Sequence, residues 1–175
     1  MSTIWYFAYG SNMQSATLRG RRGIAFHRAL PGRARGWRLV LDKPSLLGLK
    51  EAYANIIPDP ASEVLGVLYE IAATDLAHLD LTEGVLLGNY ERLEISVQPL
   101  PPSTVEVIAA YTLTSSNRDP SLLPSDRYMA LLIAGALEHG LPAEYVASLR
   151  SVPARPESAE VAQLRPLIDQ VMRRS

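Results

Sequence analysis

The order of strand-like and helix-like segments limits the folds open to this chain. Up to Leu113, short apolar or alternating segments bounded by Gly, Pro and polar turns predominate, a pattern typical of β-strands. Beyond Leu113 the apolar residues recur mostly at helical spacing. The predicted strands are Ile4–Tyr9, Ala25–Asp42 with a break at Pro31-Gly32, Ala54–Ile57, Val64–Ile71, Arg92–Leu100 and Val105–Leu113. This order favours an α+β fold.

Helices are predicted around these strands at Asp75–Thr82, Asp126–Glu138, Pro142–Arg150 and in an amphipathic tail, Ser158–Arg174. Thr74 and Ser125 are expected to cap the first two, and Gly84 and Gly140 to end them. Pro166 is expected to kink the tail or delay its start. The pattern predicts a mixed, mainly antiparallel sheet or small barrel with peripheral helices. We expect one domain over residues 1–175, with 151–175 as a C-terminal helical extension.

The composition excludes several classes of protein. A chain of 175 residues with 47% hydrophobic content is long enough for a substantial core. It has no cysteine, which excludes disulfides, thiolate catalysis and cysteine metal sites. No apolar run approaches the ~18–20 residues of a membrane span, and no secretory signal is visible. A cytoplasmic location without a membrane partner is expected.

Charge is distributed unevenly along the chain. Residues 1–50 carry a net charge of +8, and the remainder carries −9. The basic segment predicts either a surface for an anionic ligand or nucleic acid, or arginines on solvated strands that pair with acids from the rest of the chain. We expect the second, because the basic residues are not interleaved with stacking aromatics. The arginines concerned are Arg19, Arg21, Arg22, Arg28, Arg33, Arg35 and Arg38.

Motifs for metal and nucleotide binding are missing from the sequence. None of the histidines, His27, His78 and His139, has a second ligand at metal-binding spacing. There is no Gly-x-Gly-x-x-Gly motif, no phosphate-binding Gly-Lys-Ser/Thr loop and no Gly-x-Ser-x-Gly elbow. We therefore expect no metal and no cofactor, and interpret His78 as a surface or half-buried side chain.

Two short segments contain candidate binding or catalytic residues. Tyr9-Gly10-Ser11-Asn12 ends the first strand and leads into a helical start, so its backbone N–H groups form either an anion-binding nest or an ordinary turn. Glu83 ends the Asp75–Thr82 helix, where the helix dipole and apolar neighbours disfavour a carboxylate anion. Asp80, one turn earlier, is expected to approach it. Glu83 is then either a proton-transfer group or a solvated helix-terminal residue.

Taken together, these segments resemble the γ-glutamylcyclotransferase family. The shared motifs occur in family order across roughly Trp5 to Leu149. They are Phe7-Ala8-Tyr9-Gly10-Ser11-Asn12-Met13, Gly66-Val67-Leu68-Tyr69, Leu79-Asp80-Leu81-Thr82-Glu83-Gly84-Val85, Gly88-Asn89-Tyr90, Tyr128 with its helix, and Gly140-Leu141-Pro142-Ala143-Glu144-Tyr145. The resemblance implies a small mixed β-barrel with peripheral helices. It also implies release of 5-oxoproline from a small-molecule γ-glutamyl substrate by attack of the substrate's own α-amine on its γ-carbonyl, without a cofactor.

The resemblance also assigns roles to individual residues. Glu83 matches the catalytic glutamate, which takes the proton from the α-amine and returns one to the leaving nitrogen. The residues Tyr9, Gly10, Ser11 and Asn12 match the loop that holds the glutamyl group. Tyr90 and Tyr128 match tyrosines near that pocket, which bind the substrate or orient Glu83. Some family members are dimers, so the tail is expected to cover either a second copy or its own barrel.

The identity of the released amine stays open in the sequence. The segment 42–53 departs from the Gly- and Ser-rich segment of the mammalian enzyme and is expected to set the leaving group. The alternatives are an amino acid, a polyamine, a biosynthetic amine and the ε-amine of lysine. A rival from another class is a non-catalytic binding protein that uses the Arg-rich N-terminal third.

Overall fold

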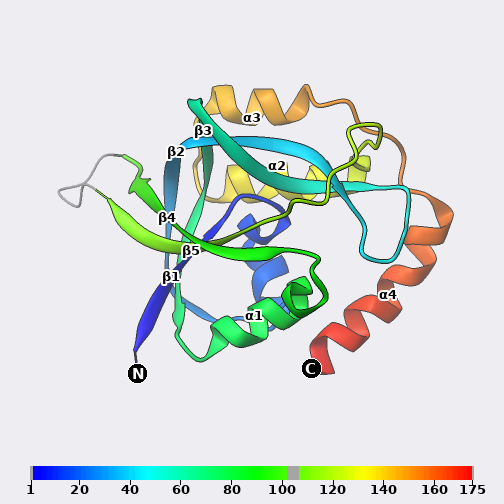
Figure 1. Ribbon diagram of the computed structural model, residues 1–175, viewed down its shortest axis with the longest axis horizontal. Helices are drawn as coiled ribbons and strands as arrows, with labels where there is room; N and C mark the ends of the chain where they lie inside the picture. The colour runs from blue at the N-terminus through cyan, green and yellow to red at the C-terminus, as the bar shows by residue number, and fades with distance from the viewer. Residues whose placement is uncertain (1, 102–106, 175) are drawn as a thin grey trace.

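A closed β-barrel lies at the centre of the molecule (Figure 1). The structure is a computed structural model that describes residues 2–101 and 107–174. Within this part of the chain the strands are β1 (Thr3–Ala8), β2 (Phe26–Pro44), β3 (Ala52–Ala72), β4 (Glu91–Pro99) and β5 (Ile108–Thr114), in the order β1-β3-β2-β4-β5. The described pairs are antiparallel except β1–β5, which closes the barrel in parallel. The predicted mixed, mainly antiparallel barrel is confirmed.

The strands β2 and β3 form a longer hairpin than the sequence indicates. The predicted break at Pro31-Gly32 is wrong, because both residues stay in register opposite β3. Pro31 has no N–H to donate, but its carbonyl accepts from Leu100 N–H at 2.8 Å, which keeps the strand in the barrel. β3 joins two predicted strands into one. The predicted start of the last strand, Val105, lies outside the described residues.

The helices occupy the positions predicted for them. They are α1 (Asp75–Glu83), α2 (Asp126–Glu138), α3 (Ala143–Arg150) and α4 (Ala159–Arg174). Ser125 caps α2 by accepting from Tyr128 N–H at 3.1 Å, and Gly84 ends α1 with φ 72°. Thr74 occupies the N-cap of α1 without a side-chain capping bond. α4 continues through Pro166, so the proline does not delay its start.

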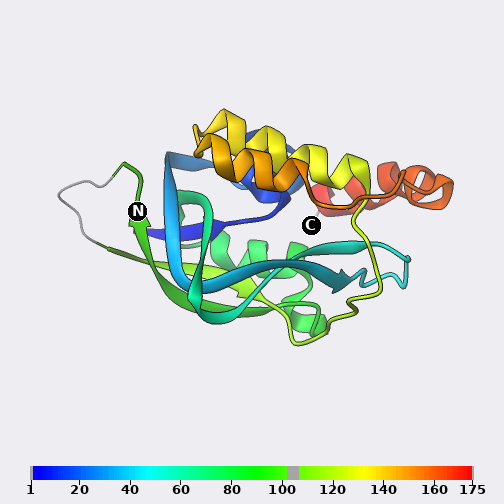
Figure 2. The ribbon, with the colours of Figure 1, turned by 90° about the horizontal axis from the view of Figure 1, so that it is seen from above.

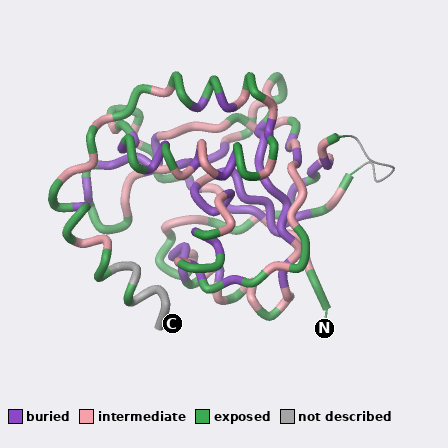
Figure 3. Tube along the Cα trace, turned by 180° about the vertical axis from the view of Figure 1, so that it is seen from behind, coloured by how far each residue is buried: buried purple, intermediate pink, exposed green. Residues whose placement is uncertain are grey.

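The core lies inside the barrel and between the barrel and α2. Figure 2 shows α2 and α3 as a layer over one side of the barrel, and Figure 3 shows the buried segments gathered at the centre. Fully buried side chains include Phe7, Met13, Ile56, Leu68, Tyr69, Ile71 and Leu132. Burial of such large apolar side chains contributes about 1.5–3 kcal/mol each.

Gly135 of α2 lets this helix rest directly on the turn that follows β1. A Cβ atom at residue 135 would lie 2.6 Å from Gln14 N and 2.7 Å from Met13 C. Met13 is the last residue of the short helical turn η1 (Ser11–Met13), and Gln14 is its C-cap. Both atoms belong to the backbone, so they cannot rotate away as a flexible side chain would. The position of this turn is therefore set by contact with α2.

We expect Gly135→Ala to destabilise the protein by about 1–3 kcal/mol, because the added methyl group overpacks this contact. Gly20→Ala is the matched control, since a Cβ atom there meets nothing within 4 Å. Urea denaturation followed by circular dichroism measures both. Equal stabilities for the two variants would show that α2 does not fix the turn.

Candidate active site

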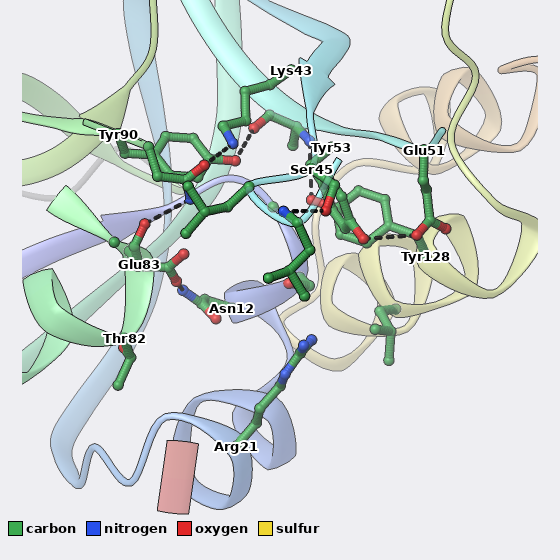
Figure 4. A pocket seen from close by; sticks show the side chains of 18 of the residues that line it. Asn12, Arg21, Lys43, Ser45, Glu51, Tyr53, Thr82, Glu83, Tyr90 and Tyr128 are labelled. Carbon is green, nitrogen blue, oxygen red and sulfur yellow. Dashed lines mark hydrogen bonds between the residues drawn. The ribbon is translucent and has the colours of Figure 1, made fainter. Parts of the chain in front are cut away.

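A cavity of about 570 Å³ opens where β1, α1 and the β2–β3 turn meet (Figure 4). Residues from the start of α2 and from α4 complete its wall. The predicted site residues all line it: Tyr9, Gly10, Ser11, Asn12, Glu83, Tyr90 and Tyr128. Cavities of roughly this size commonly bind small molecules. The fold thus gathers residues from four separate segments around one space.

Glu83 is held by two donors on the same carboxylate oxygen. Asn12 Nδ2 donates to Glu83 Oε1 at 2.7 Å, and Arg22 NH2 forms an ion pair with Oε1 at 2.9 Å. The Glu83 and Arg22 side chains are each 9% exposed. No residue that the structure describes is hydrogen-bonded to the other oxygen, Oε2. The carboxylate is therefore fixed through Oε1, while Oε2 stays available to a ligand in the cavity.

Arg22 links the Asn12 turn to the end of α1. Its Nε donates to Asn12 Oδ1 at 3.2 Å, and its NH1 donates to Thr82 O at 2.9 Å. His78, half-buried as expected, contacts the Arg22 carbonyl through Nε2 at 2.9 Å. A guanidinium with a fixed fork of donors suits such a multiple contact. Arg22 thus connects the two segments that the sequence singled out.

The surroundings of Glu83 differ from the sequence expectation. Asp80 does not pair with Glu83; its Oδ2 binds Arg92 NH1 at 2.6 Å. The nearest charge to Glu83 is the guanidinium of Arg22, not a second carboxylate. Charge-assisted contacts of this kind stabilise a carboxylate anion.

The tyrosines of the cavity bind backbone groups. Tyr128 Oη accepts from Ala54 N–H at 3.0 Å, and Tyr90 Oη donates to Ala54 O at 2.9 Å. The Ser11 backbone N–H also acts on the Tyr128 hydroxyl and lowers its pKa. Neither hydroxyl is hydrogen-bonded to Glu83 in the described part of the chain. The two tyrosines therefore hold β3 in place at the cavity wall.

Burial keeps these hydroxyls protonated. Burial raises the pKa of Tyr128 to about 12, the negative charge of Glu83 adds to the increase, and the backbone N–H of Ala54 opposes it. Burial also raises the pKa values of Tyr6, Tyr9 and Tyr90, and the Glu83 carboxylate contributes to each increase. These groups are neutral hydrogen-bonding partners throughout the physiological pH range.

Asn12, which the sequence places in the substrate loop, also contacts three protein side chains through its amide. Asn12 Nδ2 donates to Glu83 Oε1 and to Tyr6 Oη, the latter at 3.1 Å, while Oδ1 accepts from Arg22. Asn12 thus positions the carboxylate.

Lys43 and Asn89 form a second connection to Glu83 that sequence reasoning missed. Lys43 is 2% exposed, and its ammonium donates to Asn89 Oδ1 and, at 2.7 Å, to Pro44 O. It also lies 4.7 Å from the Tyr90 ring centroid. Asn89 Nδ2 donates to Glu83 O at 2.8 Å. The Gly88-Asn89-Tyr90 motif could have identified Asn89 as a residue of the site. The sequence around Lys43 contains no feature that indicates its burial.

Lys43 is expected to make stability depend on pH in one window. Burial lowers its pKa to about 8, and the Glu83 carboxylate opposes this decrease. Between about pH 8 and the ordinary lysine value near ~10.4, the unfolded chain holds a proton that the folded chain has released. Stability therefore rises with pH across this window. Below pH 8 both states are protonated, and this dependence is lost.

Urea denaturation of wild type and Lys43→Met at several pH values measures the effect. The stability of wild type relative to Lys43→Met should increase from pH 8 to pH 9.5. Taking the difference between the two proteins cancels the ionisation of tyrosines in the unfolded chain. A constant difference would contradict the lowered pKa.

Three arginines of the basic N-terminal segment pair with acids of the barrel surface. Arg28 pairs with Glu70, and the other described pairs are Arg33–Glu63 and Arg38–Asp59. Pairing with acids from beyond residue 50 is confirmed for these three arginines. Arg21 and Arg22 differ, because they line the cavity.

Metal-binding clusters and membrane-spanning helices are missing from residues 2–101 and 107–174, the described part of the chain. These residues contain no group of three or more His, Cys, Asp or Glu side chains placed to hold a metal ion. They also contain no helix with the length and apolar character needed to cross a membrane.

Comparisons with known proteins agree on one family. The AIG2-like family model matches residues 63–149. The γ-glutamylcyclotransferase of Mus musculus is 31% identical over 155 residues, covering 86% of this chain and 79% of that protein. The Bos taurus protein of the same name is 29% identical over 161 residues, covering 90% and 83%. A solved structure named γ-glutamyl cyclotransferase superposes with a TM-score of 0.80 at 26% identity, covering 99% of this chain and 100% of that one. The chain is therefore an enzyme that belongs to the γ-glutamylcyclotransferase family.

Proposed function

We propose that this enzyme converts a γ-glutamyl amide to 5-oxoproline and a free amine, with Glu83 as the general acid and base. The observation that carries the proposal is the state of the Glu83 carboxylate. Its Oε1 is fixed by Asn12 and Arg22, and its Oε2 has no described protein partner at the cavity. A general base needs such an oriented, accessible oxygen.

The attacking nitrogen must lose two protons during the reaction, and the departing nitrogen must gain two. The substrate's α-ammonium gives one proton to Glu83 Oε2, and the neutral amine attacks the γ-carbonyl carbon. The new C–N bond forms a five-membered ring, and the carbonyl oxygen becomes an oxyanion. When the original amide C–N bond breaks, Glu83 returns the proton to the departing nitrogen. The attacking nitrogen loses a second proton, and the released amine gains one, so that protons balance.

The cavity wall supports the remaining requirements. The turn Tyr9–Asn12 lies beside Glu83, and the backbone that follows it packs directly on α2. We infer that this turn binds the glutamyl group, because fixed backbone donors stabilise carboxylates and oxyanions. Holding the glutamyl chain folded lowers the entropic barrier to ring closure. Tyr90 and Tyr128 act by keeping the wall rigid around it.

A panel of γ-glutamyl amino acids and γ-glutamyl alkylamides tests the proposal. We expect enzyme-dependent formation of 5-oxoproline with an equal amount of free amine, detected by liquid chromatography and mass spectrometry. Incubation without enzyme controls for spontaneous cyclisation. Binding of these compounds without turnover would instead support a non-catalytic role.

A further inference from the structure

Asn89 binds the end of α1 although it takes no part in the proposed proton transfer. Carbonyls at the C-terminus of a helix lack partners within the helix. Asn89 Nδ2 donates to Glu83 O at 2.8 Å, and Asn89 N–H donates to Gly84 O at 3.0 Å. The Asn89 carbonyl accepts from Ser115 Oγ at 2.9 Å, and its Oδ1 accepts from Lys43 Nζ. Asn89 therefore ties the end of α1 to β2 and to the residue that follows β5.

This contact holds Glu83 at its backbone, whereas the contacts described above hold its side chain. Asn12 and Arg22 bind Oε1, and Asn89 binds the main-chain carbonyl. The position of Oε2, which the proposed reaction uses, depends on both anchors. A misplacement of about 1 Å in a reacting group can lower a rate about a hundredfold. The hold on the backbone therefore bears directly on catalysis.

Lys43 is a buried ammonium whose hydrogen-bond partners are neutral. It is 2% exposed and donates to two amide oxygens, one of them Asn89 Oδ1. None of the ion pairs between described residues includes Lys43. The titratable groups that face it are Tyr90, the Glu83 carboxylate and, opposite it in β3, Tyr53. Figure 4 shows Lys43 beside Tyr90 on the side of the cavity where Glu83 lies.

The charge of Lys43 fixes the orientation of the Asn89 amide. An ammonium has three donors and no acceptor, so the amide must turn Oδ1 toward Lys43 and Nδ2 toward Glu83 O. A neutral amine also has a lone pair and accepts from Nδ2, so it no longer imposes this orientation. The buried charge is costly for folding, but it orders the contact that holds the catalytic residue.

We propose that Lys43 and Asn89 are positioning residues that fix the backbone of Glu83, and that Lys43 does so only in its protonated form. Lys43 acts through the Asn89 amide and not on the reacting atoms. This inference rests on the proposed cyclotransferase reaction and adds a limit to it at alkaline pH. Burial lowers the pKa of Lys43 to about 8, so the hold on Glu83 weakens as pH rises through this value.

A double-mutant cycle with a γ-glutamyl alkylamide at pH 7 tests whether Lys43 acts through Asn89. We expect Lys43→Met and Asn89→Leu each to lower kcat by about tenfold to a hundredfold, with a much smaller change in KM. The double variant should lose no more than Asn89→Leu alone. Lys50→Met removes the other lysine of the chain, which is exposed, and should keep wild-type kcat. Additive losses would overturn the inference.

The pH dependence of kcat separates the effect of charge from that of packing. The ratio of kcat for wild type to kcat for Lys43→Met should fall toward one between pH 7 and about pH 9.5, because wild-type Lys43 also becomes neutral. The ratio cancels ionisation of the substrate, which both proteins share. Lys43→Arg stays charged, so its kcat should rise relative to wild type over the same range, and this comparison serves where Lys43→Met folds poorly. Ratios that are independent of pH would overturn the inference.

The outcomes also separate this inference from the reaction itself. Formation of 5-oxoproline by wild type, with unchanged kcat in Lys43→Met and Asn89→Leu, would overturn the positioning role and leave the cyclotransferase reaction intact. Absence of 5-oxoproline from every γ-glutamyl amide with wild type would overturn both.

Discussion

Replacing Glu83 with glutamine is expected to lower kcat for 5-oxoproline release by about a thousandfold, within the range of general acid–base catalysis. Glutamine keeps the size of the side chain and can still accept from Asn12 and Arg22, but it cannot take a proton from the α-ammonium. Substrate binding through the Tyr9–Asn12 turn remains, so KM should change much less than kcat. Steady-state kinetics with a γ-glutamyl alkylamide measures both.

The same substitution weakens the ion pair with Arg22, so the unfolding midpoint is also expected to fall. The kinetic assay should therefore be run at a temperature well below the unfolding midpoint of the variant, after circular dichroism has shown that the variant is folded. Glu70→Gln is the matched control, because Glu70 pairs with the exposed Arg28 on the barrel surface. It should retain wild-type kcat. Unchanged kcat in folded Glu83→Gln would exclude Glu83 as the acid and base.

Replacing Arg22 with methionine is expected to cost about 3–5 kcal/mol of stability, the usual loss when one partner of a buried ion pair is removed. Glu83 would stay buried without its counter-charge, and Asn12 Oδ1 and Thr82 O would lose their donors. Urea denaturation measures the loss. Arg28→Met is the control, and its exposed pair should contribute less than about 1 kcal/mol.

Arg22→Lys distinguishes charge from geometry at this position. Lysine keeps the positive charge but cannot reproduce the fork of donors to Asn12, Thr82 and Glu83. It should recover part of the stability lost in Arg22→Met, while kcat stays below wild type because Glu83 is less well oriented. A loss for Arg22→Met as small as that for Arg28→Met would contradict the central position of Arg22.

The barrel and the main parts of the site follow from local sequence signals. The strand Ile4–Tyr9 and the helices that became α1 and α2 carry clear periodicity and caps, and they appear within a few residues of the predicted bounds. Glu83 and the Tyr9–Asn12 turn were marked by their motifs. The structure brings them together through a hydrogen bond across 71 residues.

What the sequence did not reveal depends on contacts between distant segments. Arg22 lies in a basic run that looks solvated, yet Asn12, Thr82 and Glu83 converge on it. Lys43 is buried only because the long β2–β3 hairpin places it beside Asn89. That hairpin forms only because Pro31 stays in the strand. The sequence predicted a break there, since proline has no backbone N–H to donate.

Whether oxygen from water enters the product distinguishes cyclisation from hydrolysis most directly. The reaction of a γ-glutamyl alkylamide in water enriched with heavy oxygen, followed by mass spectrometry, tests this point. Intramolecular attack by the α-amine predicts 5-oxoproline without heavy oxygen, and an equal amount of amine. Glutamate that carries heavy oxygen in its γ-carboxylate would show attack by water and would contradict the proposed reaction.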